Sequence, residues 1–158
     1  ASARLAEIAA RTFVDPRGEP RALLTPFELS CLSIPRGSLS DAERREIEGH
    51  VTHTFRFLSE IPWTRALRRV PEIAYGHHEK LDGRGYPRAV AADGIAIETR
   101  MMTISDIYDA LTASDRPYKK AMPVDRALDI VSSEVKRGLL DPELFRIFTE
   151  AKIWEPAR

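Results

Sequence analysis

The sequence predicts an all-α domain of about six or seven helices. Apolar residues recur at three- and four-residue intervals along most of the chain, which places them on one face of a helix. No segment alternates apolar and polar residues convincingly, as a half-buried strand would. With 158 residues and 43% hydrophobic content, the chain can bury one core and is expected to form a single domain.

Two short helices are expected in the first part of the chain. Residues 1–12 carry apolar side chains at helical spacing, and residues 15–20 contain the proline and glycine typical of a turn or a hairpin tip. Thr25 and Pro26 then predict the start of a second helix, because threonine caps helices and proline favours the first helical position.

The strongest helix signal begins at Ser40, which has the spacing of a capping box with Glu43. Ile47 and Val51 lie on one apolar stripe of this helix, one turn apart. We expect the helix to continue to Pro62, because proline cannot extend it.

A further helix starts at Pro71 and leads to two adjacent histidines, His77 and His78. The residues one turn earlier are apolar, so both imidazoles are expected to point inward. Gly83 and Gly85 then end the helix and allow a tight loop. This arrangement suits a metal centre beside a substrate-binding lip. A helix C-terminus, where histidine and glycine are both favoured, explains the same residues equally well.

The last third of the chain predicts three helices and a cationic loop. Thr99 is expected to cap the helix that carries Asp106, and residues 116–120 form the cationic loop. Pro123 opens the next helix, and Asp141 caps the last one. The positions expected to face inward are Ile104, Ile107, Tyr108 and Leu111, then Ala127, Ile130, Val131 and Val135, then Leu144, Phe145 and Phe148.

Composition excludes several classes of function. The net charge is zero and the pI is near 7.1, so no electrostatic footprint for a nucleic-acid polymer is present. The single cysteine, Cys31, excludes an internal disulfide and is expected to be a small buried apolar residue. No apolar run reaches membrane-spanning length. We therefore expect a cytoplasmic protein without membrane insertion.

Four candidate metal ligands come from three of the expected helices: His50, His77, His78 and Asp106. On its helix His50 borders the apolar stripe, whereas His53 lies further round, so His50 is better placed to reach the interior. Imidazoles and a carboxylate suit iron, manganese or zinc. Paired metals of this kind are a recurrent device for phosphodiester hydrolysis, although satisfied core histidines remain the alternative.

Three segments resemble the signature of the HD-GYP family, a group of bacterial metal-dependent phosphodiesterases of the HD superfamily that hydrolyse cyclic di-GMP. They are His-His-Glu-x-x-Asp-Gly-x-Gly-Tyr-Pro at 77–87, Ile-Ser-Asp-Ile-Tyr-Asp-Ala-Leu-Thr at 104–112 and Arg-Pro-Tyr-Lys at 116–119. The resemblance extends from about Leu39 to Phe148. It implies an all-α HD-superfamily bundle and two or three divalent ions, most often iron or manganese, with zinc as an alternative. The implied products are pGpG or GMP.

The resemblance also assigns roles to individual residues. It implies metal ligands at His50, His77, His78 and Asp106, with a metal-activated hydroxide rather than a side chain as the nucleophile. Arg116 and Lys119 would lie beside the substrate phosphates, and Tyr86 would line the substrate site. Guanidinium and ammonium groups are the side chains that bind phosphate oxygens best.

The signature loop, residues 79–87, has a second implied role. Its signature positions are Glu79, Asp82, Gly83, Gly85, Tyr86 and Pro87. The resemblance implies that the loop lines the site and binds GGDEF-type cyclase partners. It also allows the chain to form a dimer. We interpret Glu79 and Asp82 as carboxylates that orient the paired histidines, and an Asx turn ahead of glycine is an equal alternative for Asp82.

The chain departs from the family in one respect. It contains no His-Asp dipeptide and no histidine before His50, so two implied metal ligands and a phosphate-facing lysine are missing. One interpretation is a degenerate, non-catalytic module that binds nucleotide or docks GGDEF-type partners. A hydrolase of another phosphoester is a third candidate.

We favour a different interpretation, in which this chain is the C-terminal part of a longer protein. The opening Ala-Ser-Ala lacks an initiator methionine. Residues 1–38 would then be a helical segment of unassigned role, interpreted as an insertion. Residues 39–150 would be the C-terminal part of an HD-GYP-like domain that is incomplete at its N-terminal side, and 151–158 a tail. The chain alone is expected to hydrolyse little.

Overall fold

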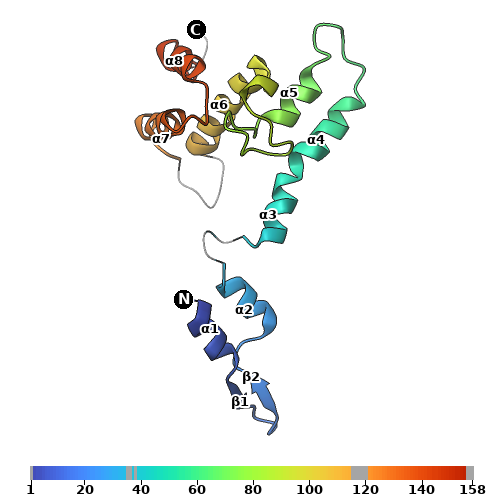
Figure 1. Cartoon of the computed structure of the whole chain (residues 1–158), viewed down its shortest axis with the longest axis vertical. Helices are drawn as coiled ribbons and strands as arrows, with labels where there is room; N and C mark the ends of the chain where they lie inside the picture. Colours follow the sequence, from blue (N-terminus) through green and yellow to red (C-terminus); the bar gives the residue numbers. More distant parts are fainter. Residues whose placement is uncertain (1, 35–36, 38, 115–120, 156–158) are drawn as a thin grey trace. The chain divides into compact units, whose positions relative to one another are not determined.

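The computed structural model describes residues 2–34, 37, 39–114 and 121–155, and Figure 1 traces its elements. Across these residues the protein is mostly helical, which confirms the expected all-α class. The chain divides into two compact units, Ala1–Ile47 and Glu48–Arg158.

The first unit contains the helices α1 (Ser2–Ala9) and α2 (Pro26–Leu32) and the hairpin strands β1 (Thr12–Val14) and β2 (Pro20–Ala22). The strands are antiparallel and pair in the register Thr12↔Ala22, Phe13↔Arg21 and Val14↔Pro20. The predicted hairpin tip is therefore confirmed. The strands themselves were not predicted, because three exposed residues are too few to show an alternating pattern.

Capping at α2 follows the sequence. Thr25 accepts a hydrogen bond from the backbone N–H of Glu28, and the Glu28 carboxylate accepts one from the N–H of Thr25. None of the side chains described in the first unit is buried, because so short a segment has little interior. Two predictions fail for this reason. Cys31 is exposed, and Ile47 is 53% exposed.

The long helix predicted from Ser40 is two helices. The capping box is present, with the Glu43 carboxylate accepting hydrogen bonds from the N–H and hydroxyl of Ser40. The first helix, α3, ends at Glu48, and the second, α4, begins at His50. Gly49 separates them, as expected of the residue that loses most conformational freedom in a helix. The two are α3 (Asp41–Glu48) and α4 (His50–Ser59).

The second unit continues with five further elements. These are α5 (Val70–Gly76), the short 3₁₀ helix η1 (Ala92–Gly94), α6 (Ile97–Thr112), α7 (Val124–Lys136) and α8 (Pro142–Glu150). Helix α4 packs on α5, which contacts α6, and α6 in turn packs against α7 and α8 (Figure 1). The pair α4–α5 and the group α6–α7–α8 therefore meet at α6.

The core lies between α6, α7 and α8. Its buried members are Ile104, Tyr108, Ala127, Val131, Leu140 and Phe148. The predicted inward face of α6 is confirmed by Ile104 and Tyr108. On α7, Ile130 is an exception to the predicted set, because it remains 36% exposed.

Helix α6 begins earlier than predicted. Its N-cap is Ala96, whereas Thr99 lies inside the first turn and is buried. The preceding turn is fastened by Arg100, whose guanidinium donates to the carbonyls of Ala92 and Ile95 and pairs with Asp141 at 3.0 Å. This side chain holds the start of α6 in place, so no threonine cap is needed.

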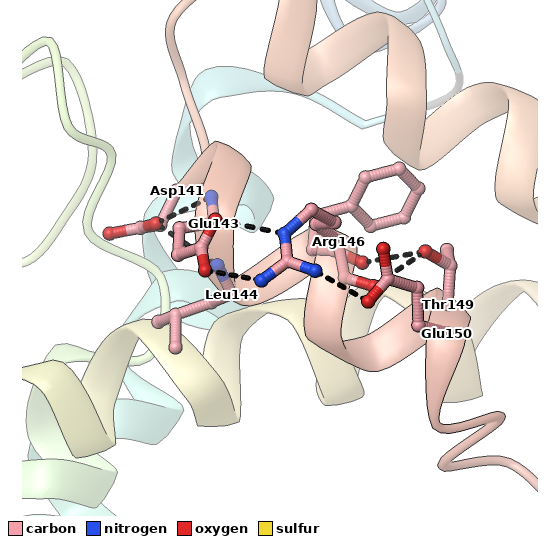
Figure 2. Close-up of polar contacts among 7 residues, drawn as sticks. Asp141, Glu143, Leu144, Arg146, Thr149 and Glu150 are labelled. Atoms are coloured by element: carbon pink, nitrogen blue, oxygen red, sulfur yellow. Dashed lines mark hydrogen bonds and ion pairs between the residues drawn. The ribbon is translucent and has the colours of Figure 1, made fainter.

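Helix α8 begins and is stabilised as its sequence predicts. The Asp141 side chain accepts hydrogen bonds from the backbone N–H groups of Glu143 and Leu144, as Figure 2 shows. Further along, Arg146 pairs with carboxylates three residues before it and four residues after it, Glu143 and Glu150. These contacts lie on the exposed face, opposite the buried Phe148.

Candidate metal centre

Three histidines converge where α4 begins and α5 ends. His50 is the first residue of α4, while His77 and His78 directly follow α5. Each offers a ring nitrogen, and these three atoms lie within 4.8 Å of one another. The ring centroids are 5.7 Å apart for His50 and His77, 5.1 Å for His50 and His78, and 4.1 Å for the adjacent pair.

The ring of His77 is held in a defined tautomer. This side chain is buried, and its Nδ1 lies 2.6 Å from the backbone carbonyl oxygen of Ala74. A carbonyl oxygen only accepts hydrogen bonds, so Nδ1 carries the proton. In the neutral ring Nε2 then keeps its lone pair, as a metal ligand requires.

His78 is kept neutral by its surroundings. Burial, with help from the neighbouring charge of His77, lowers the pKa of His78 to about 4, although Asp106 acts in the opposite direction. The ring is therefore uncharged near neutral pH and free to donate a lone pair. It stacks on the ring of Tyr86, with 4.7 Å between centroids and 28° between planes.

Asp106 lies near His78 and Tyr86 but outside the group of three histidines. It sits half-buried on α6, and its charge favours protonation of both His78 and Tyr86. Its carboxylate is not among the atoms that lie within 4.8 Å of one another. The donor set of three imidazoles with a carboxylate nearby fits a borderline divalent metal such as iron, manganese or zinc.

One acidic residue at the site was missed from the sequence. Burial raises the pKa of Tyr86, and the charges of Glu48 and then Asp106 add to the effect. Glu48 is half-buried at the end of α3. No sequence signal identified it, because residues two apart on a continuous helix, such as Glu48 and His50, do not share a face.

Among the described residues, the Glu79 carboxylate, which we interpreted as orienting the paired histidines, makes no hydrogen bond to either of their rings. Glu79 is 2% exposed, and its two oxygens accept hydrogen bonds from the backbone N–H groups of Arg88, at 2.7 Å, and Val90, at 3.1 Å. His77 is oriented by a backbone carbonyl instead. The Glu79 carboxylate therefore fastens the chain that follows the signature loop.

For Asp82 the alternative interpretation is the correct one. Its side chain accepts a hydrogen bond from the backbone N–H of Arg84 at 3.0 Å, which is an Asx turn. It also pairs with the Arg84 guanidinium at 3.6 Å. Gly83 follows with φ of +76°, a conformation that favours glycine. Asp82 therefore shapes the loop and does not orient a histidine.

Gly85 allows the signature loop to lie directly on the end of α5. A Cβ atom at this position would come within 2.4 Å of the Glu79 Cα and the Lys80 nitrogen. The next residue, Tyr86, donates its backbone N–H to the carbonyl of His78 at 3.3 Å and is joined to Pro87 by a cis peptide bond. The loop backbone thus lies against the histidine pair.

Arg116 and Lys119 lie outside the residues that the structure describes. His53 is exposed on α4 and does not belong to the group of three, as expected from its position on the helix.

Comparison with known proteins defines the class. Residues 22–144 match the HD domain family, so the chain belongs to it. Its relatives are cyclic dinucleotide phosphodiesterases, and together with the His77–Pro87 signature they place the chain in the HD-GYP family. The implied all-α fold agrees with the structure.

Three relatives illustrate the similarity. The chain is 43% identical over 115 residues to the 3'3'-cGAMP-specific phosphodiesterase 3 of Vibrio cholerae, covering 73% of this chain and 24% of that protein. It is 36% identical over 115 residues to a cyclic di-GMP phosphodiesterase of Pseudomonas aeruginosa, and the match covers 73% of this chain and 27% of that protein. For a cyclic di-GMP phosphodiesterase of Thermotoga maritima the identity is 35% over 112 residues, covering 71% and 30%. The matched part of the chain thus spans about a quarter of the length of these relatives.

Among the described residues, none of the helices is both long and apolar enough to cross a bilayer.

Proposed function

We propose that this chain forms part of a metal-dependent phosphodiesterase that hydrolyses cyclic dinucleotides. The observation that carries the proposal is the convergence of His50, His77 and His78, whose ligand atoms lie within 4.8 Å. The names of the relatives support the substrate class, since they include phosphodiesterases for cyclic di-GMP and for 3'3'-cGAMP. Linear pGpG or GMP would be the product from cyclic di-GMP.

The metal would be held by His50, His77, His78 and Asp106. Bound there, divalent ions would neutralise phosphate charge and supply a nucleophilic water near neutral pH. Iron or manganese is proposed first and zinc as an alternative, with two or three ions in a complete domain. The chain's own contribution is to present Nε2 of His77 through the Ala74 contact and to keep His78 uncharged.

The substrate would be bound by groups beside these ligands. Arg116 and Lys119 are proposed to contact the phosphate oxygens, and Tyr86, stacked on His78, to lie beside the bound dinucleotide. The signature loop is also a proposed docking surface for a GGDEF-type partner. Cytoplasmic location and a dimer belong to the same proposal.

The missing His-Asp pair favours a second candidate, a non-catalytic module that binds nucleotide or a partner. One experiment distinguishes the two candidate functions. The full-length gene product is loaded with Mn²⁺ or Fe²⁺ and given cyclic di-GMP or 3'3'-cGAMP, and the products are analysed by chromatography. A linear product that disappears in the His77→Ala variant supports the enzyme. Nucleotide binding in calorimetry without any product supports the second candidate instead.

A further inference from the structure

The buried carboxylate of Glu79 joins two segments of the chain around the histidine pair. It follows His78 directly, and its two oxygens accept hydrogen bonds from the backbone N–H groups of Arg88 and Val90, nine and eleven residues further on. With only 2% of the residue exposed, these bonds are shielded from water. Buried charge-assisted bonds of this kind are strong, and their loss leaves unpaired polar groups behind.

The segment closed by these bonds carries Tyr86. Its backbone is packed so tightly on residues 78–80 that Gly85 leaves no space for a Cβ atom. The Tyr86 ring stacks on His78, with 28° between the planes. Glu79 thus closes a loop whose one aromatic ring lies against a candidate metal ligand.

The two adjacent histidines are held by different means. His77 donates a hydrogen bond to the Ala74 carbonyl. Among the described residues, His78 makes no hydrogen bond through its ring, and its contacts are with the rings of His50, His77 and Tyr86. A metal-bound imidazole needs a partner that fixes its orientation. For His78 that partner is an aromatic ring rather than a polar group.

We propose that Glu79 is a positioning residue for His78, acting through the signature loop: by holding the backbone at Arg88 and Val90 it keeps the Tyr86 ring stacked on the His78 imidazole. The inference rests on the proposed role of His78 as a metal ligand. It assigns to Glu79 an effect on the metal site without any contact to the metal.

The first test is made without metal, by NMR of the apo chain. Glu79→Gln preserves the shape of the side chain, but its single carboxamide oxygen cannot accept both N–H groups as the carboxylate does. The stacked Tyr86 ring should shift the His78 ring-proton resonances, and Tyr86→Leu defines the full loss of this shift. Glu79→Gln is expected to move the resonances toward the Tyr86→Leu position. The matched control, Glu143→Gln on the exposed face of α8, should leave them unchanged.

The second test measures Zn²⁺ affinity by competition with a chromophoric chelator. Glu79→Gln is expected to weaken binding about tenfold, as loss of a partner that orients a ligand does. In the double variant Glu79→Gln/Tyr86→Leu, the Glu79 substitution should add little to the loss of Zn²⁺ affinity caused by Tyr86→Leu alone, because both substitutions act on the stacking of Tyr86 on His78. Fully additive losses would overturn the proposal.

Two further results would also overturn it. One is unmoved His78 resonances in a folded Glu79→Gln variant. The other is a Tyr86→Leu variant that binds Zn²⁺ as tightly as the wild-type chain. This second result can be obtained even if Glu79→Gln does not fold. Failure of the proposed function has a different signature, namely a wild-type chain that binds no Zn²⁺ while its His78 resonances still respond to Glu79→Gln.

Discussion

Replacing His77 by alanine should remove most of the metal affinity of this chain. His77 supplies one of three ring nitrogens within 4.8 Å, and its Nε2 is preset by the bond to Ala74. Structural zinc sites with four ligands bind with about 10–16 kcal/mol, so one ligand contributes about 2.5–4 kcal/mol. At about 1.4 kcal/mol for each factor of ten, His77→Ala should weaken Zn²⁺ binding by about 60- to 700-fold.

The matched control is His53→Ala, which removes the same side chain from the exposed face of α4. It should change the affinity by less than about twofold, since the exposed His53 ring lies outside the group of three ring nitrogens and surface substitutions have small effects. Competition with a chromophoric chelator at fixed pH measures both variants, and circular dichroism shows whether each remains folded. Equal losses in the two variants would show that the three rings do not act as one site.

Three other predictions concern stability, measured by urea unfolding. Gly85→Ala should lower the free energy of unfolding by about 1–3 kcal/mol, because the new Cβ would lie 2.4 Å from the Glu79 Cα and the Lys80 nitrogen. An unchanged free energy of unfolding would contradict the close packing of the loop. Val131 lies in the core and is 0% exposed, so Val131→Ala should lower the free energy of unfolding by about 2–3 kcal/mol. Val124 is 39% exposed, and Val124→Ala should lower it by less than about 1 kcal/mol. Burial and the charge of His77 lower the pKa of His78 from 6.5 to about 4, so the unfolded chain takes up this proton first. Stability should therefore fall between pH 6.5 and 4, by about 1 kcal/mol after solvent screening, and a His78→Gln variant that keeps the same slope would refute this.

The sequence predicted the parts of the site that depend on local spacing. His50 was chosen over His53 from helix faces, and the structure brings a ring nitrogen of His50 to the pair that follows α5, although the His50 side chain is exposed and does not reach the interior as expected. The caps at Thr25 and Asp141 were likewise correct, because capping involves residues only a few positions apart.

Errors occurred where the deciding contact joins distant or irregular segments. The role of Glu79 depends on two backbone N–H groups in a loop, and no periodicity predicts where loop N–H groups lie. The start of α6 was misplaced because Arg100 fastens the preceding turn by bonds to carbonyls and to Asp141, 41 residues away. Gly49 could have predicted the break between α3 and α4, because glycine is unfavourable inside a helix. The capping box at Ser40 and the apolar stripe favoured one continuous helix instead.

The charge of the donor set limits how many ions the described residues can hold. Histidine binds metal as a neutral ligand, so His50, His77 and His78 together leave the charge of a divalent ion uncompensated. Asp106 offers one negative charge nearby, which reduces a single ion to about +1. A second ion would meet the repulsion of the first, and the charges of Asp106 and Glu48, which both act on Tyr86, would have to serve both ions. Under the proposed function the same excess positive charge would attract a phosphodiester, so the described ligands would suit one ion facing an anionic substrate, and a second ion would need a carboxylate that bridges both.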